Sequence, residues 1–463
     1  MNLSRRSFLA SGVSACAAAC LRSAHAASAD ALPDYWCAPL DAVASRVCAL
    51  RTDGAGEAFF FFTDVHTAAN ALHSGALVAE LVSRTGFTRA FCGGDVPVAY
   101  GGSSFKATLD LSMENYRRHW IDPIGEAGGL LLTAKGNHDF SIRESSSSTA
   151  GYTYSDAAAR AFIMTSNHRP FAITNPADPI ACYCYRDVPS ARVRYIVADS
   201  CDRASANPNQ AWGVSYGMHD EQLAWMADVA FGTVPDGWGV VVMQHIPCAP
   251  IVESGGIVSS LVTFRQLMEA YQNRGRISIA GAERDFASAG GCVLANITGH
   301  HHADRWTFLN GIHHVTIACD AWYNDYRNDS PFCGTLPTRG HGTANEHVVD
   351  AFQWDASRGL LHETRLGPGQ NKCFHVTPVR LAAGATHVFT ATQLTGAVSW
   401  TCYDGDTFTY NDAGTSSETC WTFANQHGTI DANGFFRAGA SGSSVVVAMD
   451  GNLNKEIFGV TVT

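Results

Sequence analysis

The chain has 463 residues, of which 46% are hydrophobic and 16% are charged, and its formal net charge is −11. This length exceeds the usual size of one domain, so we expect two folded units and a processed segment. The hydrophobic content is enough for a large core, which excludes a disordered chain. The negative charge excludes a nucleic-acid backbone or an anionic membrane as the main partner, because both attract clustered Lys and Arg.

The first 26 residues have the features of an export signal. Arg5 and Arg6 precede an uncharged stretch at 8–21, and Ala24-His25-Ala26 offers a small-residue cleavage site. A paired arginine before a short apolar region predicts twin-arginine export, and therefore a periplasmic, extracellular or cell-surface protein. Two alternatives stay open, an ordinary amphipathic first helix and a lipoprotein anchored at Cys16. No later run of 18 apolar residues occurs, so we expect no transmembrane span in the mature chain.

Short apolar runs alternate with helical patterns between residues 37 and 375, which predicts an α/β domain. Each predicted strand is a β-rich run bounded by polar or glycine signals. We expect buried strands at 58–62, 130–133, 195–198, 240–243 and 293–297. We expect helices at 68–84, 157–164 and 220–230.

Metal-ligand side chains follow these strands in five motifs. In chain order the motifs are Thr63-Asp64-Val65-His66, Gly93-Gly94-Asp95, Gly136-Asn137-His138-Asp139, Gln244-His245-Ile246-Pro247 and Gly299-His300-His301-His302. All but the second, whose preceding strand is short, begin just past the C-terminal end of a predicted strand. Open α/β sheets bind ligands at that edge, so we expect the motifs to meet in space.

The candidate ligands combine two kinds of donor atom, which suit manganese, iron or zinc. The oxygen donors are Asp64, Asp95 and Asn137, and the imidazole donors are His66, His245, His300 and His302. This mixture suggests a two-metal hydrolase.

The three consecutive histidines raise the question of which of them are ligands. In an extended loop, His300 and His302 share one face while His301 points away. A ligand imidazole needs an acceptor for its other ring nitrogen, and Asp304 is a candidate for that partner. Asp199, at the end of a predicted strand, is either a distant helper of the site or a loop cap.

The order D-x-H, G-G-D, G-N-H-D, H and G-H-x-H resembles that of the calcineurin-like metallophosphoesterases. The resemblance covers roughly residues 55–371 and includes Gln222-Leu223-Ala224-Trp225 and a late hairpin at 352–365, which are similar to exported bacterial members. It implies a four-layer α/β/β/α sandwich. It also implies a first metal held by Asp64, His66, Asp95 and His302 and a second held by Asp95, Asn137, His245 and His300, with Asp95 bridging.

The same resemblance implies hydrolysis of phosphate esters by a hydroxide that bridges the two metals. His138 would protonate the departing alkoxide as general acid, and Asp139 would either orient His138 or serve a structural role at the loop bend. Protein Ser/Thr phosphatases and purple acid phosphatases carry other residues shortly after the bridging Asp, where this chain has Val98 and Ala99. We therefore expect the substrate to be a phosphate monoester or diester, and we expect the chain to be neither a protein Ser/Thr phosphatase nor a purple acid phosphatase.

Residues 376–463 have a different character, with short alternating runs at 386–392, 398–402 and 445–448 that predict an all-β sandwich. Asn433-Gly434 predicts a hairpin. The segment 420–435 resembles bacterial Ig-like domains, which implies a spacer or a cell-surface attachment.

The rival prediction is a catalytically silent binding or adhesion protein that acts through this Ig-like domain. Cysteine positions suggest two disulfides, Cys37 with Cys48 and Cys402 with Cys420.

Overall fold

The computed structural model describes residues 32–51, 56–67, 73–97, 105–143, 151–153, 156–163, 172–202, 217–249, 259–321, 339–405 and 424–463. The predicted signal segment at 1–26, the positions Val98 and Ala99, and Cys420 of the second predicted disulfide lie outside these residues. None of the described helices is both long and apolar enough to cross a bilayer.

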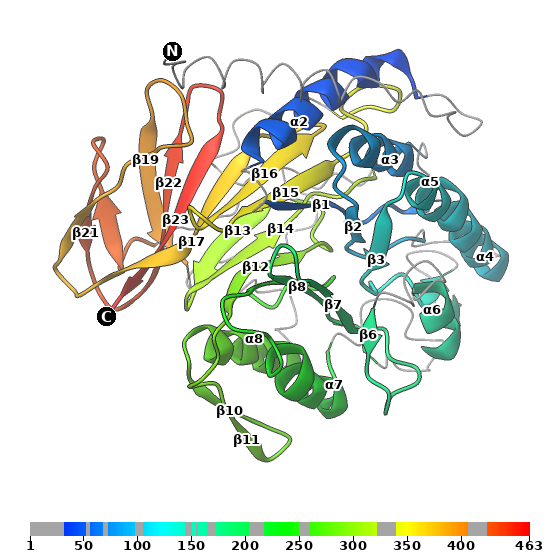
Figure 1. Cartoon of the computed structure of the whole chain (residues 1–463), viewed down its shortest axis with the longest axis horizontal. Coiled ribbons are helices and arrows are strands. Elements are labelled where there is room, and N and C mark those ends of the chain that lie inside the picture. Colours follow the sequence, from blue (N-terminus) through cyan, green and yellow to red (C-terminus); the bar gives the residue numbers. More distant parts are fainter. Residues whose placement is uncertain are drawn as a thin grey trace, which may run out of the picture.

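Two large sheets form the centre of the molecule (Figure 1). From edge to edge, the first sheet contains β19 (Ser399–Asp404), β22 (Gly442–Met449), β23 (Lys455–Val462), β17 (Lys372–Leu381), β16 (Leu360–Leu366), β15 (Val349–Asp355), β1 (Glu57–Phe62), β2 (Arg89–Cys92) and β3 (Leu130–Thr133). The second sheet contains β13 (Arg305–Leu309), β14 (Ile312–Thr316), β12 (Cys292–Thr298), β9 (Gly239–Met243), β8 (Val193–Val197), β7 (Cys184–Val188) and β6 (Ile173–Thr174). In both sheets a parallel set, β1-β2-β3 and β8-β9-β12, carries the predicted motifs at its C-terminal ends.

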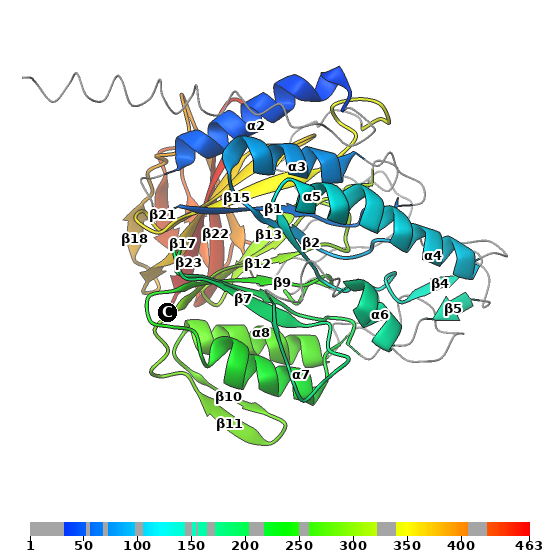
Figure 2. The same cartoon turned by 45° about the vertical axis from the view of Figure 1, so that its right-hand side comes forward.

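Helices cover the outer face of each sheet, which gives the α/β/β/α layers (Figure 2). The first sheet is covered by α2 (Cys37–Leu50), α3 (Ser74–Thr85), α4 (Phe105–Tyr116) and α5 (Asp122–Glu126), the last two joined through 117–121. The second sheet is covered by α7 (Asp220–Trp225), which continues through Met226–Phe231, and by α8 (Ser259–Gln272). The four-layer arrangement that we expected is therefore present.

Strand β1 shows why the sequence folds into these layers. Phe59 and Phe61 lie in the core between the two sheets, whereas Phe60 and Phe62 pack beneath the outer helices. Successive side chains of a strand point to opposite faces, so a strand covered on both sides reads as a continuous apolar run. The five predicted strands correspond to β1, β3, β8, β9 and β12, and each observed boundary lies within two residues of the predicted one.

The remaining described elements are short. They are Asp34–Trp36, β4 (Ser141–Arg143), β5 (Gly151–Thr153), α6 (Asp156–Ile163), β10 (Arg276–Ile279), β11 (Ala282–Asp285), β18 (Thr386–Val388), β20 (Gly428–Ile430) and β21 (Phe435–Ala438). Strands β20 and β21 form the hairpin predicted at Asn433-Gly434, and β15 and β16 form the hairpin predicted at 352–365.

The C-terminal segment is all-β but shares a sheet with the rest of the chain. Strand β17 spans the predicted boundary at 375, pairing with β16 on one side and with β23 on the other. A small core containing Phe389, Phe436 and Phe458 belongs to this segment. Its Tyr403 hydroxyl also donates to the Trp306 carbonyl, 2.9 Å away, in the second sheet. The segment therefore packs against both sheets.

The predicted disulfide between Cys37 and Cys48 is wrong. Both residues lie on α2, eleven positions apart. At 1.5 Å per residue they are separated by about 16 Å, well beyond the reach of a disulfide.

Candidate metal centre

The seven predicted ligands converge where the C-terminal ends of the two parallel strand sets meet. Each comes from the loop that follows a strand: Asp64 and His66 follow β1, Asp95 follows β2, Asn137 follows β3, His245 follows β9, and His300 and His302 follow β12. Their ligand atoms form two neighbouring groups.

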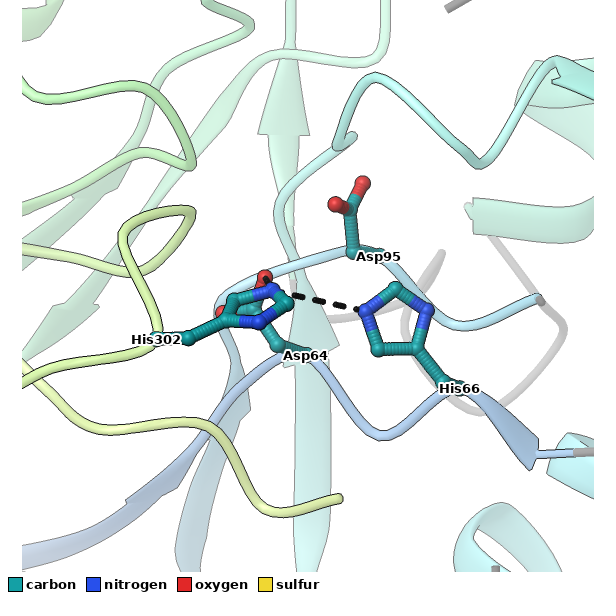
Figure 3. A group of neighbouring side chains, drawn as sticks. All are labelled: Asp64, His66, Asp95 and His302. Carbon is teal, nitrogen blue, oxygen red and sulfur yellow. Dashed lines mark hydrogen bonds and ion pairs between the residues drawn. The ribbon is translucent and has the colours of Figure 1, made fainter. Parts of the chain in front are cut away.

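The first group consists of Asp64, His66, Asp95 and His302, whose ligand atoms all lie within 4.8 Å of one another (Figure 3). Asp64 Oδ1 lies 3.2 Å from His302 Nε2. His66 Nε2 lies 3.5 Å from the same nitrogen. All four residues are buried.

The second group consists of Asp95, His245 and His300, and the Asn137 amide oxygen lies beside both histidines. His245 Nε2 lies 3.1 Å from Asp95 Oδ2 and 3.0 Å from Asn137 Oδ1. His300 Nδ1 lies 3.0 Å from the same amide oxygen. Asp95 is shared by the two groups, so a cation in each would have this carboxylate in common.

Hydrogen bonds to the backbone fix which ring nitrogen of two imidazoles faces the site. His66 Nδ1 lies 2.8 Å from the Pro97 carbonyl oxygen, and His245 Nδ1 lies 2.8 Å from the Gly93 carbonyl oxygen. A carbonyl accepts only, so each Nδ1 carries the hydrogen, and in the neutral ring each Nε2 presents a lone pair. The His245 lone pair then faces the Asp95 carboxylate and the Asn137 amide oxygen, and the His66 lone pair faces His302 Nε2, so each neutral ring is oriented to bind a cation lying between these groups.

Asp64 is also arranged so that one oxygen remains for a cation. Its Oδ2 accepts from the Thr63 hydroxyl at 2.7 Å and from the His300 backbone N–H at 3.0 Å. Its buried Oδ1 has no hydrogen-bond partner among the described residues. A buried oxygen of this kind is costly unless an ion completes it, so the donor set fits divalent cations.

The electrostatics of the site also favour positive charge. Burial opposes the charge of the Asp95 carboxylate, yet the neighbouring His245 and His138 hold its pKa well below the usual value. Burial likewise opposes a charge on His245, yet Asp95 and Asp64 raise its pKa to about 10. The carboxylates therefore create a potential strong enough to hold a proton on a buried imidazole, and a metal ion would meet the same attraction.

Backbone strain is concentrated in the ligands. Five of the ten described non-glycine residues with positive φ are Asp64, His66, Asp95, His300 and His302. The left-handed region costs such residues of the order of 1–3 kcal/mol, and it persists where surrounding structure imposes it, commonly at functional sites.

The positive φ values also correct the reasoning about the three histidines. With φ of 72° and 54°, His300 and His302 do not lie in an extended loop, so alternation is not what places them. They turn to different groups, His300 towards Asn137 and His302 towards Asp64. The His301 ring packs against that of His300 and lies outside both groups.

Asp139 supports the ligand loops through their backbone. Its Oδ2 accepts from the N–H groups of Gly136, at 2.6 Å, and Asp95, at 3.1 Å. Its Oδ1 accepts from the Val96 N–H at 2.8 Å. Of the two roles considered for Asp139, these contacts favour the structural one.

Three further polar side chains lie beside the ligand loops: Thr63, Lys135 and Asp199. Thr63 orients Asp64, as described above. Lys135 Nζ lies 2.7 Å from Asp199 Oδ2, and both side chains are buried beside the loop that carries Asn137. The sequence carried a signal for both Thr63 and Lys135, since Thr63 begins the first metal motif and Lys135 directly precedes the third.

Asp304, the candidate acceptor for a ligand imidazole, binds a buried arginine. It pairs with Arg365 through two contacts of 2.8 Å and accepts from the Ala318 N–H. The acceptors for His66 and His245 are the backbone carbonyls instead.

His138 lies at the edge of the site, beside the shared carboxylate. Its backbone N–H donates to Asp95 Oδ1 at 2.8 Å, and its Nε2 lies 3.7 Å from Asp95 Oδ2. Burial lowers the pKa of His138 to about 4, although Asp95 opposes this shift. At pH 7 a ring with this pKa is neutral.

Several solved structures are similar to this chain. A dimetal phosphatase from Danio rerio matches at 13% identity, over 68% of this chain and 97% of that one, with a TM-score of 0.43. A putative 5'-nucleotidase from Staphylococcus aureus, in complex with alpha-ketoglutarate, matches at 13% identity over 65% and 51%, with a TM-score of 0.35. The phosphopantetheinyl hydrolase from Mycobacterium tuberculosis matches at 12% identity over 58% and 91%, with a TM-score of 0.30.

No protein-family model and no curated protein matches the chain. At these identities and TM-scores, similarity to solved structures establishes no activity by itself. The layers and the shared-carboxylate site of this chain define the class of protein: an α/β/β/α protein with a site for divalent metal.

Proposed function

We propose that this chain is an exported hydrolase of phosphate monoesters or diesters that works with two divalent or mixed-valence ions of manganese, iron or zinc. The observation that carries the proposal is the pair of ligand groups that share Asp95. Asp64, His66, Asp95 and His302 would hold one ion, and Asp95, Asn137, His245 and His300 the other. Export is supported by the paired arginines at the N-terminus.

Two ions at such a site lower the pKa of a bound water and hold the phosphoryl oxygens for in-line displacement. The chain's own residues set the conditions for that chemistry. Asp95 brings the two groups together, and Asn137 contributes a neutral oxygen, which preserves the positive charge beside it. The carbonyls of Pro97 and Gly93 hold two imidazoles in the required orientation.

His138 is placed to give a proton to the leaving alkoxide. A neutral ring is a poor acid, but a phosphate anion beside it would raise its pKa, as any nearby negative charge does. Binding of the substrate would thus charge the group that protonates the leaving oxygen.

The direct test is to supply the full chain, loaded with manganese, iron or zinc, with a panel of phosphate monoesters and diesters and to measure alcohol release. We expect turnover of at least one class. Two metals bound with no turnover of any ester would contradict the proposal and favour the silent adhesion protein.

A further inference from the structure

A second cluster of metal-ligand side chains lies outside the centre described above. His73 directly precedes α3, while Glu346 and His347 lie just before β15, and their ligand atoms are all within 4.8 Å of one another. His73 Nδ1 lies 3.9 Å from Glu346 Oε2, and His347 Nε2 lies 3.6 Å from Glu346 Oε1. His341 adds a third imidazole, with its Nδ1 2.9 Å from Glu346 Oε1. We call these four residues the His73 cluster.

The orientation of His347 points to a ligand. Asp320 Oδ1 lies 2.9 Å from His347 Nδ1, so this nitrogen donates to a carboxylate, and Nε2 is left facing the cluster. His347 is fully buried, and its Nε2 has no hydrogen-bond partner among the described residues. A carboxylate behind an imidazole whose other nitrogen is unsatisfied is the arrangement that surrounds many metal-bound histidines.

The His73 Nδ1 atom gives a second observation of the same kind. It is buried and also lacks a hydrogen-bond partner in the described ranges. Two imidazole nitrogens and a carboxylate thus converge from two distant parts of the chain without hydrogen bonds between the imidazoles and the carboxylate. A cation would satisfy both nitrogens at once, and Glu346, which already accepts from the Gly342 N–H and faces His341 Nδ1, would supply the negative charge.

We propose that the His73 cluster binds a third divalent metal ion of the zinc class. His73, His347 and Glu346 supply two nitrogens and one oxygen within reach of one ion, and His341, which lies beside Glu346, can turn to add the fourth ligand of a tetrahedral site, the form that structural zinc takes. The His341 side chain is 59% exposed, so an ion can reach the cluster from solvent.

The ion would fasten the start of α3 to the segment 339–348, and it would act on the catalytic loops through Asp320. The Asp320 N–H donates to the Thr63 carbonyl at 2.8 Å, and the next N–H, of Ala321, donates to the Asp64 carbonyl at 3.2 Å. One residue thus supports both a ligand of the third site and the loop of the first ligand group. The site does not depend on any phosphoesterase activity.

The test measures metal in Asp64→Asn/Asp95→Asn, a variant in which both ligand groups of the shared centre lose the carboxylates that attract a cation while the side chains keep their size. After incubation of this full-length variant with zinc and dialysis, plasma mass spectrometry should find about one equivalent. Adding His73→Ala and His347→Ala should reduce the bound zinc to about zero. Adding His387→Ala instead, which removes an imidazole from β18, should leave the bound zinc at about one equivalent.

The outcomes separate this proposal from the proposed function. No zinc in Asp64→Asn/Asp95→Asn would overturn the third site and leave a cluster of ion pairs between histidines and Glu346, whatever the activity of the wild type. Zinc retained after His73→Ala/His347→Ala would also overturn it. If that variant does not fold, the stoichiometry of Asp64→Asn/Asp95→Asn decides alone. The second expected result is that zinc raises the melting temperature of Asp64→Asn/Asp95→Asn. An unchanged melting temperature would count against the site.

Discussion

At the scale of single residues, His138 connects the geometry of the site to its proposed chemistry. Its ring is neutral at pH 7 because burial lowers its pKa to about 4. Proton donation to the leaving oxygen therefore requires a phosphate anion nearby. If His138 is the proton donor, its contribution to the rate should be large for a leaving group that needs a proton and small for one that does not.

We predict that His138→Ala lowers kcat for an alkyl phosphate by about 10²–10⁴-fold, which is the usual worth of a general acid. The same variant should hydrolyse a nitrophenyl phosphate almost as fast as wild type, because nitrophenolate leaves without protonation. Steady-state kinetics on both esters, with metal content checked in parallel and His387→Ala as control, would decide. Equal losses on the two esters would show that His138 is not the acid.

The ligand residues could be predicted because each is a polar donor directly after an apolar strand. Their orientation could not, since the carbonyls of Pro97 and Gly93 reach the His66 and His245 rings only in the folded chain. The partner of Asp304 could not be predicted either, because Arg365 lies 61 positions away in the sequence.

At the scale of secondary-structure elements, a buried ion pair joins the loops at the ends of the two sheets. Lys135 follows β3, Asp199 follows β8, and their charged atoms lie 2.7 Å apart. Burial raises the pKa of Asp199 to about 6, even though Lys135 opposes this shift. Without the lysine, the buried carboxylate would have a still higher pKa.

We predict that Lys135→Met destabilises the protein by about 3–5 kcal/mol at pH 8, because it leaves an uncompensated buried charge. The pKa of Asp199 is higher in the folded than in the unfolded chain, so the free energy of unfolding falls as the pH rises above the unfolded-state pKa. The destabilisation caused by Lys135→Met should therefore be smaller at pH 5, where Asp199 is protonated. Urea unfolding of the wild type and of Lys135→Met at pH 8 and at pH 5 measures this destabilisation.

The matched control for this prediction is Arg284→Met, which breaks a pair with the half-exposed Asp228 and should cost about 1 kcal/mol or less. Equal stability of Lys135→Met and wild type at pH 8 would refute the role given to the ion pair.

The strands were predictable because runs such as Phe59 to Phe62 are apolar on both faces. The tight loop at His300–His302 was not, because its positive φ values result from packing against the Asp64 loop. A Cβ at Gly299 would lie only 2.0 Å from Thr63 Oγ1, so the two loops touch at a glycine.

At the scale of the whole molecule, the C-terminal segment continues the first sheet. The boundary expected at 375 was read from a change of composition, but β17 crosses it, and its partner β23 comes from the end of the chain. Such non-local pairing leaves no local signal. Gly459 in β23 lies against Phe308 of the second sheet, where a Cβ would come within 2.3 Å of the ring.

We predict that Gly459→Ala lowers the free energy of unfolding of the whole chain by about 1–3 kcal/mol through overpacking. Gly451→Ala, at a position where a Cβ would meet nothing within 4 Å, is the control and should change little. Thermal unfolding can be monitored by the release of bound metal. The midpoint of that transition should move to lower temperature in Gly459→Ala and stay unchanged in Gly451→Ala. An unchanged metal-loss transition would mean that the segment unfolds independently of the metal centre.

The measurement that tests the central claim most directly is reconstitution of phosphoester hydrolysis by metal. The full chain treated with a chelator should be inactive and should recover turnover on addition of manganese, iron or zinc, because the ions supply the charge that the Asp64 and Asp95 groups are built to hold. Asp95→Asn should recover almost none. Full turnover in the chelated wild type, or full recovery in Asp95→Asn, would contradict the proposal of a metal phosphoesterase built on a shared carboxylate.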